Sequence, residues 1–261
     1  MLHLENVSKT YTLSTGYVIS AVEDITLDVN QGELLVLLGP SGSGKTTLLR
    51  MIAGLENPST GAIYLDGTKV DSSGPVPGFG MIFQAYTAFP WLTVKENIAF
   101  ALKYKQGVSR THRQDIVQHL LNLVGLSNFA DAFPKELSGG MKQRVALARA
   151  LAAHPKVLLM DEPFNALDAL TRAQLQSEFV KLSNQDHFTT LFVTHDLDEA
   201  LLIADRIILL TPRPGRILAE YNLRSCLRNR DRHDSRFLEL RQEIYSAMSD
   251  SVEIAVSGEA R

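Results

Sequence analysis

The stretch Gly39-Pro-Ser-Gly-Ser-Gly-Lys45-Thr46 follows the apolar run ELLVLL at residues 33–38 and precedes a helical pattern over residues 45–53. This order of strand, glycine-rich loop and helix fits the phosphate-binding loop pattern. Glycines let the backbone wrap closely around a phosphate, and successive N–H groups then point at the anion. The start of the helix adds the positive end of its dipole.

Two side chains of this loop carry the chemistry. In such a loop the lysine, here Lys45, reaches the β- and γ-phosphates, and the following hydroxyl, here Thr46, binds Mg²⁺. We therefore predict an ATP-binding site with Mg²⁺ as its metal. The residues expected around the phosphates are Gly39, Pro40, Ser41, Gly42, Ser43, Gly44, Lys45, Thr46 and Thr47.

Further apolar runs resemble the one before the loop. They are KVLLM at 156–160, TLFVT at 190–194 and RIILL at 206–210, and helical patterns over 172–182 and 196–203 lie between them. Continuous apolar runs bounded by turn residues are typical of parallel strands covered on both faces. The alternation of strands and helices predicts an α/β fold with a P-loop NTPase core, a mainly parallel sheet and right-handed crossovers.

Two regions depart from this alternation. Residues 2–30 and 62–70 contain short alternating strands that predict an antiparallel β subdomain. Residues 86–153 are mostly helical, with apolar positions three and four apart, and predict an inserted helical subdomain. We therefore expect one nucleotide-binding domain over residues 1–220. Residues 221–261 form a C-terminal helical tail to which the sequence assigns no role.

The composition excludes some classes of protein. The chain has 26 Lys and Arg against 29 Asp and Glu, a net charge of −3, which is unlike the basic excess of nucleic-acid-binding proteins. Its single cysteine, Cys226, cannot form an internal disulfide. No apolar run is long enough to cross a bilayer, and no secretory leader is visible. We expect a soluble, cytoplasmic chain whose membrane partners are other polypeptides.

A pair of carboxylates ends the second apolar run, in Val157-Leu-Leu-Met-Asp161-Glu162. A carboxylate at the end of a buried strand can hold Mg²⁺ opposite the loop hydroxyl, a role that fits Asp161. The neighbouring Glu162 can activate the attacking water as a general base. The alternative is a strand that leads into an acidic helix cap.

A second glycine pair occurs in Leu137-Ser-Gly-Gly-Met-Lys-Gln-Arg144. Ser138 is predicted to cap a helix, because serine accepts a backbone hydrogen bond well at this position. An ordinary capped helix is the simpler interpretation. Gly139 and Gly140 after the cap would also permit close approach of a phosphate to the positive end of the helix.

The phosphate loop at 39–46, the Leu-Ser-Gly-Gly signature at 137–140 and the Asp161-Glu162 strand end follow one another along the chain. In this order they resemble the ATP-binding cassette (ABC) ATPase family, over residues 2–217. The resemblance implies that Gln84 approaches Mg²⁺ and the attacking water, and that His195 contacts the γ-phosphate. It also implies that Asp168, in Asn165-Ala-Leu-Asp168, lies at a dimer seam. Tyr11 resembles the aromatic residue that stacks on adenine, and Tyr17 is a rival for that role.

The family mechanism implies a dimer. Two subunits pack head to tail, and each ATP lies between the phosphate loop of one and the Ser138, Gly139 and Gly140 signature of the other. ATP hydrolysis then releases the subunits and drives a membrane partner. The sequence departs from the common family pattern at Met141 and Asn165, neither of which contacts phosphate in that pattern.

Several fragments indicate the branch of the family. The segments 84–98, 161–172 and 212–217 are most similar to importers of nitrate, sulfonate or taurine, and related importers carry bicarbonate, cyanate or pyrimidine precursors. The expected partners are a paired cassette, integral membrane permease subunits and, indirectly, a solute-binding protein, with the chain on the cytoplasmic face of the membrane. The alternative is an ATPase subunit of an ABC exporter or lipid-handling system.

Phe89 and Trp91 follow Gln84 closely. In the family, residues at this place line a groove that accepts a short helix of the membrane subunit, and an exposed aromatic pair would suit such an anchor. The alternative, of equal weight, is that both belong to the core of the helical subdomain.

Overall fold

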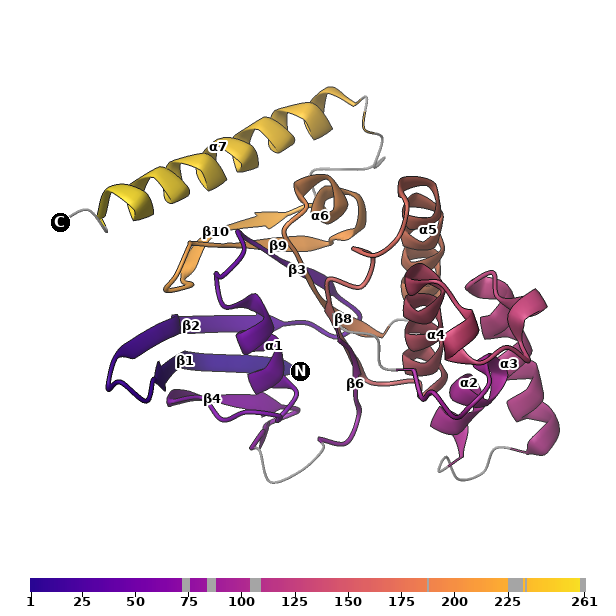
Figure 1. Ribbon diagram of the computed structural model, residues 1–261. Coiled ribbons are helices and arrows are strands. Elements are labelled where there is room, and N and C mark those ends of the chain that lie inside the picture. Colours follow the sequence, from indigo (N-terminus) through magenta and orange to yellow (C-terminus); the bar gives the residue numbers. More distant parts are fainter. Residues whose placement is uncertain are drawn as a thin grey trace. The chain divides into compact units, whose positions relative to one another are not determined.

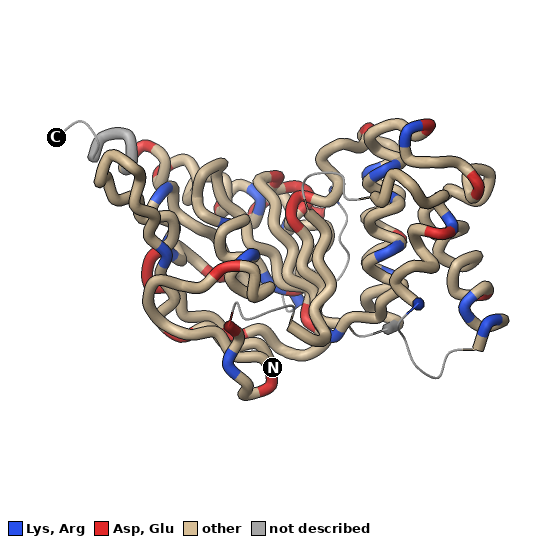
Figure 2. Tube along the Cα trace, turned by 60° about the horizontal axis from the view of Figure 1, so that its bottom comes forward, with Lys and Arg blue, Asp and Glu red and all other residues tan. Residues whose placement is uncertain are grey.

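The structure is a computed structural model that describes residues 1–71, 76–83, 88–103, 109–186, 188–224, 232 and 234–258. The chain packs as two compact units (Figure 1). The first unit joins Met1–Pro77 with Thr189–Arg261, and the second is Gly78–Phe188. Acidic and basic residues are interspersed along both (Figure 2).

The first unit contains an antiparallel sheet of order β2-β1-β4-β5. Its strands are β1 (Leu2–Thr12), β2 (Val18–Val29), β4 (Thr60–Leu65) and β5 (Thr68–Lys69). A two-residue turn joins β4 to β5, with φ of 49° at Asp66 and 76° at Gly67. Both angles lie in the left-handed region that Asp-Gly adopts readily in tight hairpins. The antiparallel pairing predicted for residues 2–30 and 62–70 is confirmed.

The same unit contains parallel strands. The central strand β3 (Leu34–Leu38) pairs in parallel with β8 (Thr189–Thr194) and with β9 (Arg206–Leu210). Strand β10 (Ile217–Asn222) lies antiparallel along β9. Every residue of β3 is buried, since helices α1 (Lys45–Ile52) and α6 (Leu197–Ile203) pack close to these strands. The continuous apolar runs are therefore parallel strands, as predicted.

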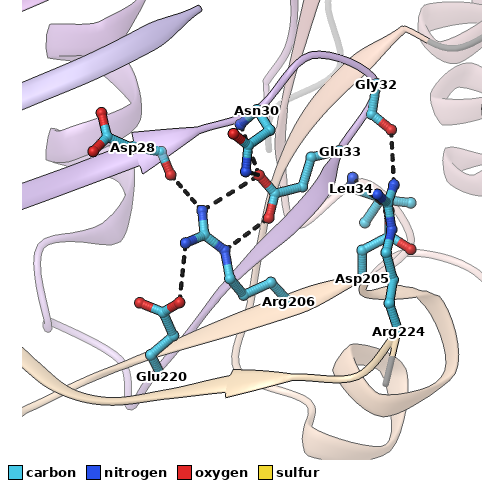
Figure 3. Close-up of polar contacts among 9 residues, drawn as sticks. All are labelled: Asp28, Asn30, Gly32, Glu33, Leu34, Asp205, Arg206, Glu220 and Arg224. Atoms are coloured by element: carbon cyan, nitrogen blue, oxygen red, sulfur yellow. Dashed lines mark hydrogen bonds and ion pairs between the residues drawn. The ribbon is translucent and has the colours of Figure 1, made fainter. Parts of the chain in front are cut away.

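Ion pairs fix the end of β3 that is remote from the glycine-rich loop (Figure 3). Arg206 donates from Nε to Glu33 Oε1 at 2.7 Å and from Nη1 to Glu220 Oε1 at 3.0 Å. Asp205 accepts the backbone N–H of Leu34 at 3.0 Å through Oδ2. Glu33 is buried, so its pairing with a guanidinium offsets the cost of desolvating its charge.

The C-terminal helix α7 (Ser235–Gly258) packs on α6. Phe237, Leu240 and Ile244 of α7 are buried, and their spacing of three and four residues places them on one face of the helix. Arg241 Nε donates to Asp198 Oδ1 of α6 at 2.6 Å. Helix α7 therefore makes up much of the tail that begins at residue 221.

The second unit pairs β6 (Phe79–Ile82) with β7 (Val157–Asp161) in parallel. Its helices are α2 (Val94–Leu102), α3 (Arg110–Leu123), α4 (Gly139–Ala152) and α5 (Ala169–Asp186), with short 3₁₀ turns at Ser127–Phe129 and Pro134–Glu136. Thr93 and Glu96 form a reciprocal capping box at the start of α2. Within the part of the chain that the structure describes, no helix combines the length and apolarity needed to span a membrane.

Candidate functional site

The glycine-rich loop curves around the amine of Lys45. This side chain is buried, and Nζ donates to the backbone oxygens of Gly39 and Pro40, both at 2.8 Å, and to Ser43 Oγ at 3.2 Å. Helix α1 begins at Lys45 itself. The loop thus holds one cation at the positive end of a helix, which is the arrangement that phosphate binding requires.

Gly42 and Gly44 hold the loop in a conformation that other residues rarely adopt. Both have φ of 83°. A Cβ atom on Gly44 would lie 2.4 Å from Val22 Cγ1 and 2.6 Å from the Ala21 carbonyl oxygen. Glycine is therefore needed at position 44 for its backbone conformation and also for close packing against β2.

Tyr11 lies near Thr47, at the end of the predicted phosphate site. The Tyr11 hydroxyl donates to Glu56 Oε2 at 3.0 Å and also forms a hydrogen bond with Thr47. Burial is the main reason why the pKa of Tyr11 is raised. Lys9 Nζ lies 5.2 Å from the centre of the Tyr11 ring. Tyr17 is 67% exposed in the turn between β1 and β2.

His195 directly follows β8, and the phosphate loop directly follows β3. Leu38 and Thr194 are paired in register at the ends of these parallel strands, so Gly39 and His195 leave one sheet edge as neighbours. Asp196 Oδ1 caps α6 by accepting the Glu199 N–H at 3.0 Å. The fold therefore brings the predicted switch histidine and phosphate loop together within the first unit.

The carboxylate pair lies in the second unit, at the end of β7. Asp161 is 3% exposed and Glu162 has φ of 48°, a left-handed conformation that is uncommon for a non-glycine residue. Asn165 Nδ2 donates to Glu162 Oε2 at 2.5 Å, and the Asn165 N–H donates to the Glu162 carbonyl at 3.3 Å. Sequence reasoning missed this contact, although the spacing of three residues in a turn was its available signal.

The signature forms the start of α4, as predicted. Ser138 Oγ accepts the Met141 N–H at 3.3 Å, so Ser138 is the helix cap. A Cβ atom on Gly140 would lie 2.9 Å from Leu167 Cδ2, so this glycine lets α4 approach the turn that follows Glu162. Gln143 Nε2 donates to the Glu162 carbonyl at 3.4 Å and links α4 to the same turn.

The remaining predicted site residues are Asp168 and Gln84. Asp168 Oδ1 accepts the Thr171 N–H at 3.0 Å at the start of α5. Hydrogen bonds, first of all the one from Thr171, lower the pKa of the Asp168 carboxyl group. Gln84 lies outside the residues that the structure describes. The first unit thus contains the phosphate loop, Tyr11 and His195, and the second unit contains the carboxylates, the signature and Asp168.

Comparisons with known proteins place the chain in a family. The family described as ABC transporter matches residues 22–165. An ABC transporter ATP-binding protein of Methanocaldococcus jannaschii is 46% identical over 253 residues, which cover 96% of this chain and 92% of that protein. The nitrate import ATP-binding protein NrtD of a Synechocystis strain is 46% identical over 85% of this chain and 83% of its own length.

Other comparisons agree with these matches. The bicarbonate transport ATP-binding protein CmpC of Synechococcus elongatus is 50% identical over 81% of this chain, which spans only 32% of that longer protein. A solved dimeric ATP-binding cassette, MJ0796 in a post-hydrolysis state with ADP and phosphate, superposes with a TM-score of 0.77. It is 35% identical and covers 85% of this chain and 99% of its own. The chain therefore belongs to the ABC transporter family, as an ATP-binding and ATP-hydrolysing subunit with the α/β fold of a P-loop NTPase.

Proposed function

We propose that this chain drives an ABC importer that takes up a small anion such as nitrate, sulfonate or taurine. The similarity to the nitrate import protein NrtD, over 85% of this chain, carries the proposal. The bicarbonate transport protein CmpC, at 50% identity, adds a second relative whose name specifies a small anion. The names of the two relatives specify different solutes, nitrate and bicarbonate, but both solutes are small anions.

In the proposed reaction, residues 39–47 bind the phosphates of ATP through backbone N–H groups and through Lys45. Glu162 polarises the attacking water as general base, and His195 contacts the γ-phosphate. Gln84 approaches the attacking water that Glu162 polarises. Tyr11, rather than Tyr17, stacks on adenine, which its proximity to Thr47 supports.

Mg²⁺ is the proposed metal. The Thr46 hydroxyl and the Asp161 carboxylate supply oxygen atoms, the type of ligand that Mg²⁺ prefers, and Gln84 would add an amide oxygen. The burial of Asp161 at a strand end suits a carboxylate that is compensated by a cation. When bound, Mg²⁺ neutralises charge on the β- and γ-phosphates.

The chain is proposed to work as a dimer, with itself or with a second cassette. Two ATP molecules would be held at a head-to-tail seam, each against Ser138, Gly139 and Gly140 of the opposite subunit. The dimeric state of the solved cassette at 35% identity supports this arrangement. The start of α4 presents a capped helix end with two glycines, as contact with a phosphate across a seam requires. Asp168 would lie at the same seam.

Phe89 and Trp91 are proposed to dock the permease on the cytoplasmic face of the membrane. Trp91 is 69% exposed, which favours an anchor over a core residue. Its ring stacks on Phe89, with 5.5 Å between centroids. The Phe89 ring also contacts Phe100, with 4.8 Å between the ring centroids, and the Arg149 guanidinium, whose Cζ lies 4.6 Å from the Phe89 centroid. A supported, exposed aromatic residue is typical of a binding hot spot.

Reconstitution tests the proposal. The chain would be co-purified with its permease and solute-binding protein, inserted into vesicles, and assayed for ATP-dependent uptake of nitrate, bicarbonate, sulfonate and taurine. We expect inward transport of one anion, abolished by Lys45→Ala. Transport of a solute or lipid in the outward direction would instead support the exporter or lipid-handling alternative and overturn the importer.

A further inference from the structure

The turn between β9 and β10, residues 211–216, is closed on itself. Thr211 Oγ1 donates to the Pro214 carbonyl at 2.8 Å and accepts the Arg216 N–H at 2.9 Å. The Thr211 N–H donates to the Arg216 carbonyl at 3.0 Å. In the sequence this segment, with its Pro-Arg-Pro-Gly-Arg motif, only helps to mark a branch of the family. The internal hydrogen bonds show that it is an ordered element.

Backbone hydrogen bonds also fix the turn to strand β2. The Gly215 N–H donates to the Ala21 carbonyl at 3.0 Å, and the Glu23 N–H donates to the Gly215 carbonyl at 2.9 Å. Gly215 thus forms a parallel bridge with Val22. Val22 is also the residue that contacts Gly44, so β2 supports the turn and the phosphate loop together.

Gly215 packs directly against the phosphate loop. A Cβ atom on Gly215 would lie 2.0 Å from the carbonyl oxygen of Ser43, which is too close for any residue with a side chain. Glycine is therefore needed here for the approach of two backbones rather than for an unusual φ. The turn and the loop consequently lie in van der Waals contact.

The Arg213 side chain extends from this turn towards Gly42 of the phosphate loop. Its Nη2 atom lies 3.9 Å from the position that a Cβ atom on Gly42 would occupy. Arg213 forms neither a hydrogen bond nor an ion pair through its guanidinium with any residue that the structure describes. By contrast, the Arg216 guanidinium of the same turn pairs with Glu23 at 2.9 Å. Arg213 is thus an exposed cation beside the loop, with no carboxylate partner among the residues that the structure describes.

We propose that Arg213 is a nucleotide-binding residue that contributes a second cation, after Lys45, to the phosphates of ATP. The inference rests on the proposed role of residues 39–47. The planar guanidinium suits phosphate oxygens, which it can bind through two parallel N–H groups. Because Arg213 is exposed, its contribution is screened by water and salt, and we expect a change in affinity of about twofold to fivefold.

Paired variants of the same turn test the inference on the full-length chain. Arg213→Gln and Arg213→Lys would be compared with Arg216→Gln, which removes an exposed guanidinium that already has a partner. Dissociation constants for ATP, ADP and AMP would be measured by calorimetry at about 0.05 M and about 0.5 M salt. Thermal unfolding of each variant would report on stability.

Arg213→Gln is expected to weaken ATP binding about twofold to fivefold at low salt and less at high salt, with AMP least affected. Arg213→Lys should retain part of the affinity, and Arg216→Gln should bind ATP like the wild type. Unchanged ATP affinity in Arg213→Gln would overturn the inference. An equal loss for ATP and AMP, or an equal loss in Arg216→Gln, would also overturn it, because the effect would then be structural.

Lys45→Ala separates this inference from the proposed function. If Lys45→Ala loses ATP binding while Arg213→Gln keeps it, only the role of Arg213 is wrong. If Lys45→Ala binds ATP normally, the assignment of the phosphate loop is wrong and the role of Arg213 falls with it.

Discussion

Alanine at position 44 would place a methyl group where the phosphate loop packs on β2. The new Cβ atom would lie 2.4 Å from Val22 Cγ1 and 2.6 Å from the Ala21 carbonyl oxygen. The valine side chain can rotate, but the carbonyl is backbone, so overpacking should cost about 1–3 kcal/mol. The φ of 83° adds about 1–2 kcal/mol for a residue with a side chain. Gly44→Ala should therefore lower the free energy of unfolding by about 2–5 kcal/mol.

Gly67→Ala is the matched control. Gly67 has φ of 76°, and a Cβ atom there would meet nothing within 4 Å, so this variant bears only the conformational cost of about 1–2 kcal/mol. Denaturant unfolding and ATP titration of both variants would be compared with the wild type. We expect Gly44→Ala to be less stable than Gly67→Ala and to bind ATP weakly even where it is folded. Equal stability of the two variants, together with wild-type ATP affinity in Gly44→Ala, would refute the reasoning.

Four other substitutions probe the remaining site residues. Glu162→Gln should stop hydrolysis but keep ATP binding, so that size-exclusion chromatography with ATP shows a long-lived dimer; near wild-type turnover would remove Glu162 from the role of base. Asn165→Ala should lower kcat about threefold to tenfold at constant KM, with no further loss in a Glu162→Gln background; a change in KM alone would contradict the positioning role. Trp91→Ala should leave stability and ATP binding intact while co-purification with the permease is lost, and global unfolding would show that the ring belongs to the core. Ser138→Arg should block hydrolysis at the opposite subunit's site, which mixing with Lys45→Ala subunits tests through partial recovery of activity.

The parallel strands could be predicted because their signal is local. RIILL at 206–210 and TLFVT at 190–194 are mostly apolar, and both are strands whose apolar residues are buried. The phosphate loop was equally predictable, since a glycine-rich loop between a strand and a helix has few alternative conformations. Ser138 was identified as a cap from its residue type and from the helix formers that follow it.

Contacts made by single side chains could not be predicted in the same way. The spacing of three residues between Glu162 and Asn165 permits their hydrogen bond, but it does not specify the left-handed φ of Glu162. The approach of Arg213 to Gly42 joins residues that are far apart in sequence, so only the folded chain shows it. The exposure of Trp91 depends on packing within the helical part of the chain, and the sequence left a core role and a surface role equally open.

Strand β3 connects the ion pair of Glu33 and the Leu34–Asp205 hydrogen bond at its start to the phosphate loop at its end. It is buried throughout and paired with a parallel strand on each side, the environment in which amide groups are most protected from local opening. We expect these amides to exchange with deuterium only through global unfolding. Bound ATP should slow that exchange by the factor by which it stabilises the folded chain, about 100-fold at about 100 times the dissociation constant. The strand that carries the nucleotide loop thereby becomes a built-in reporter of nucleotide affinity.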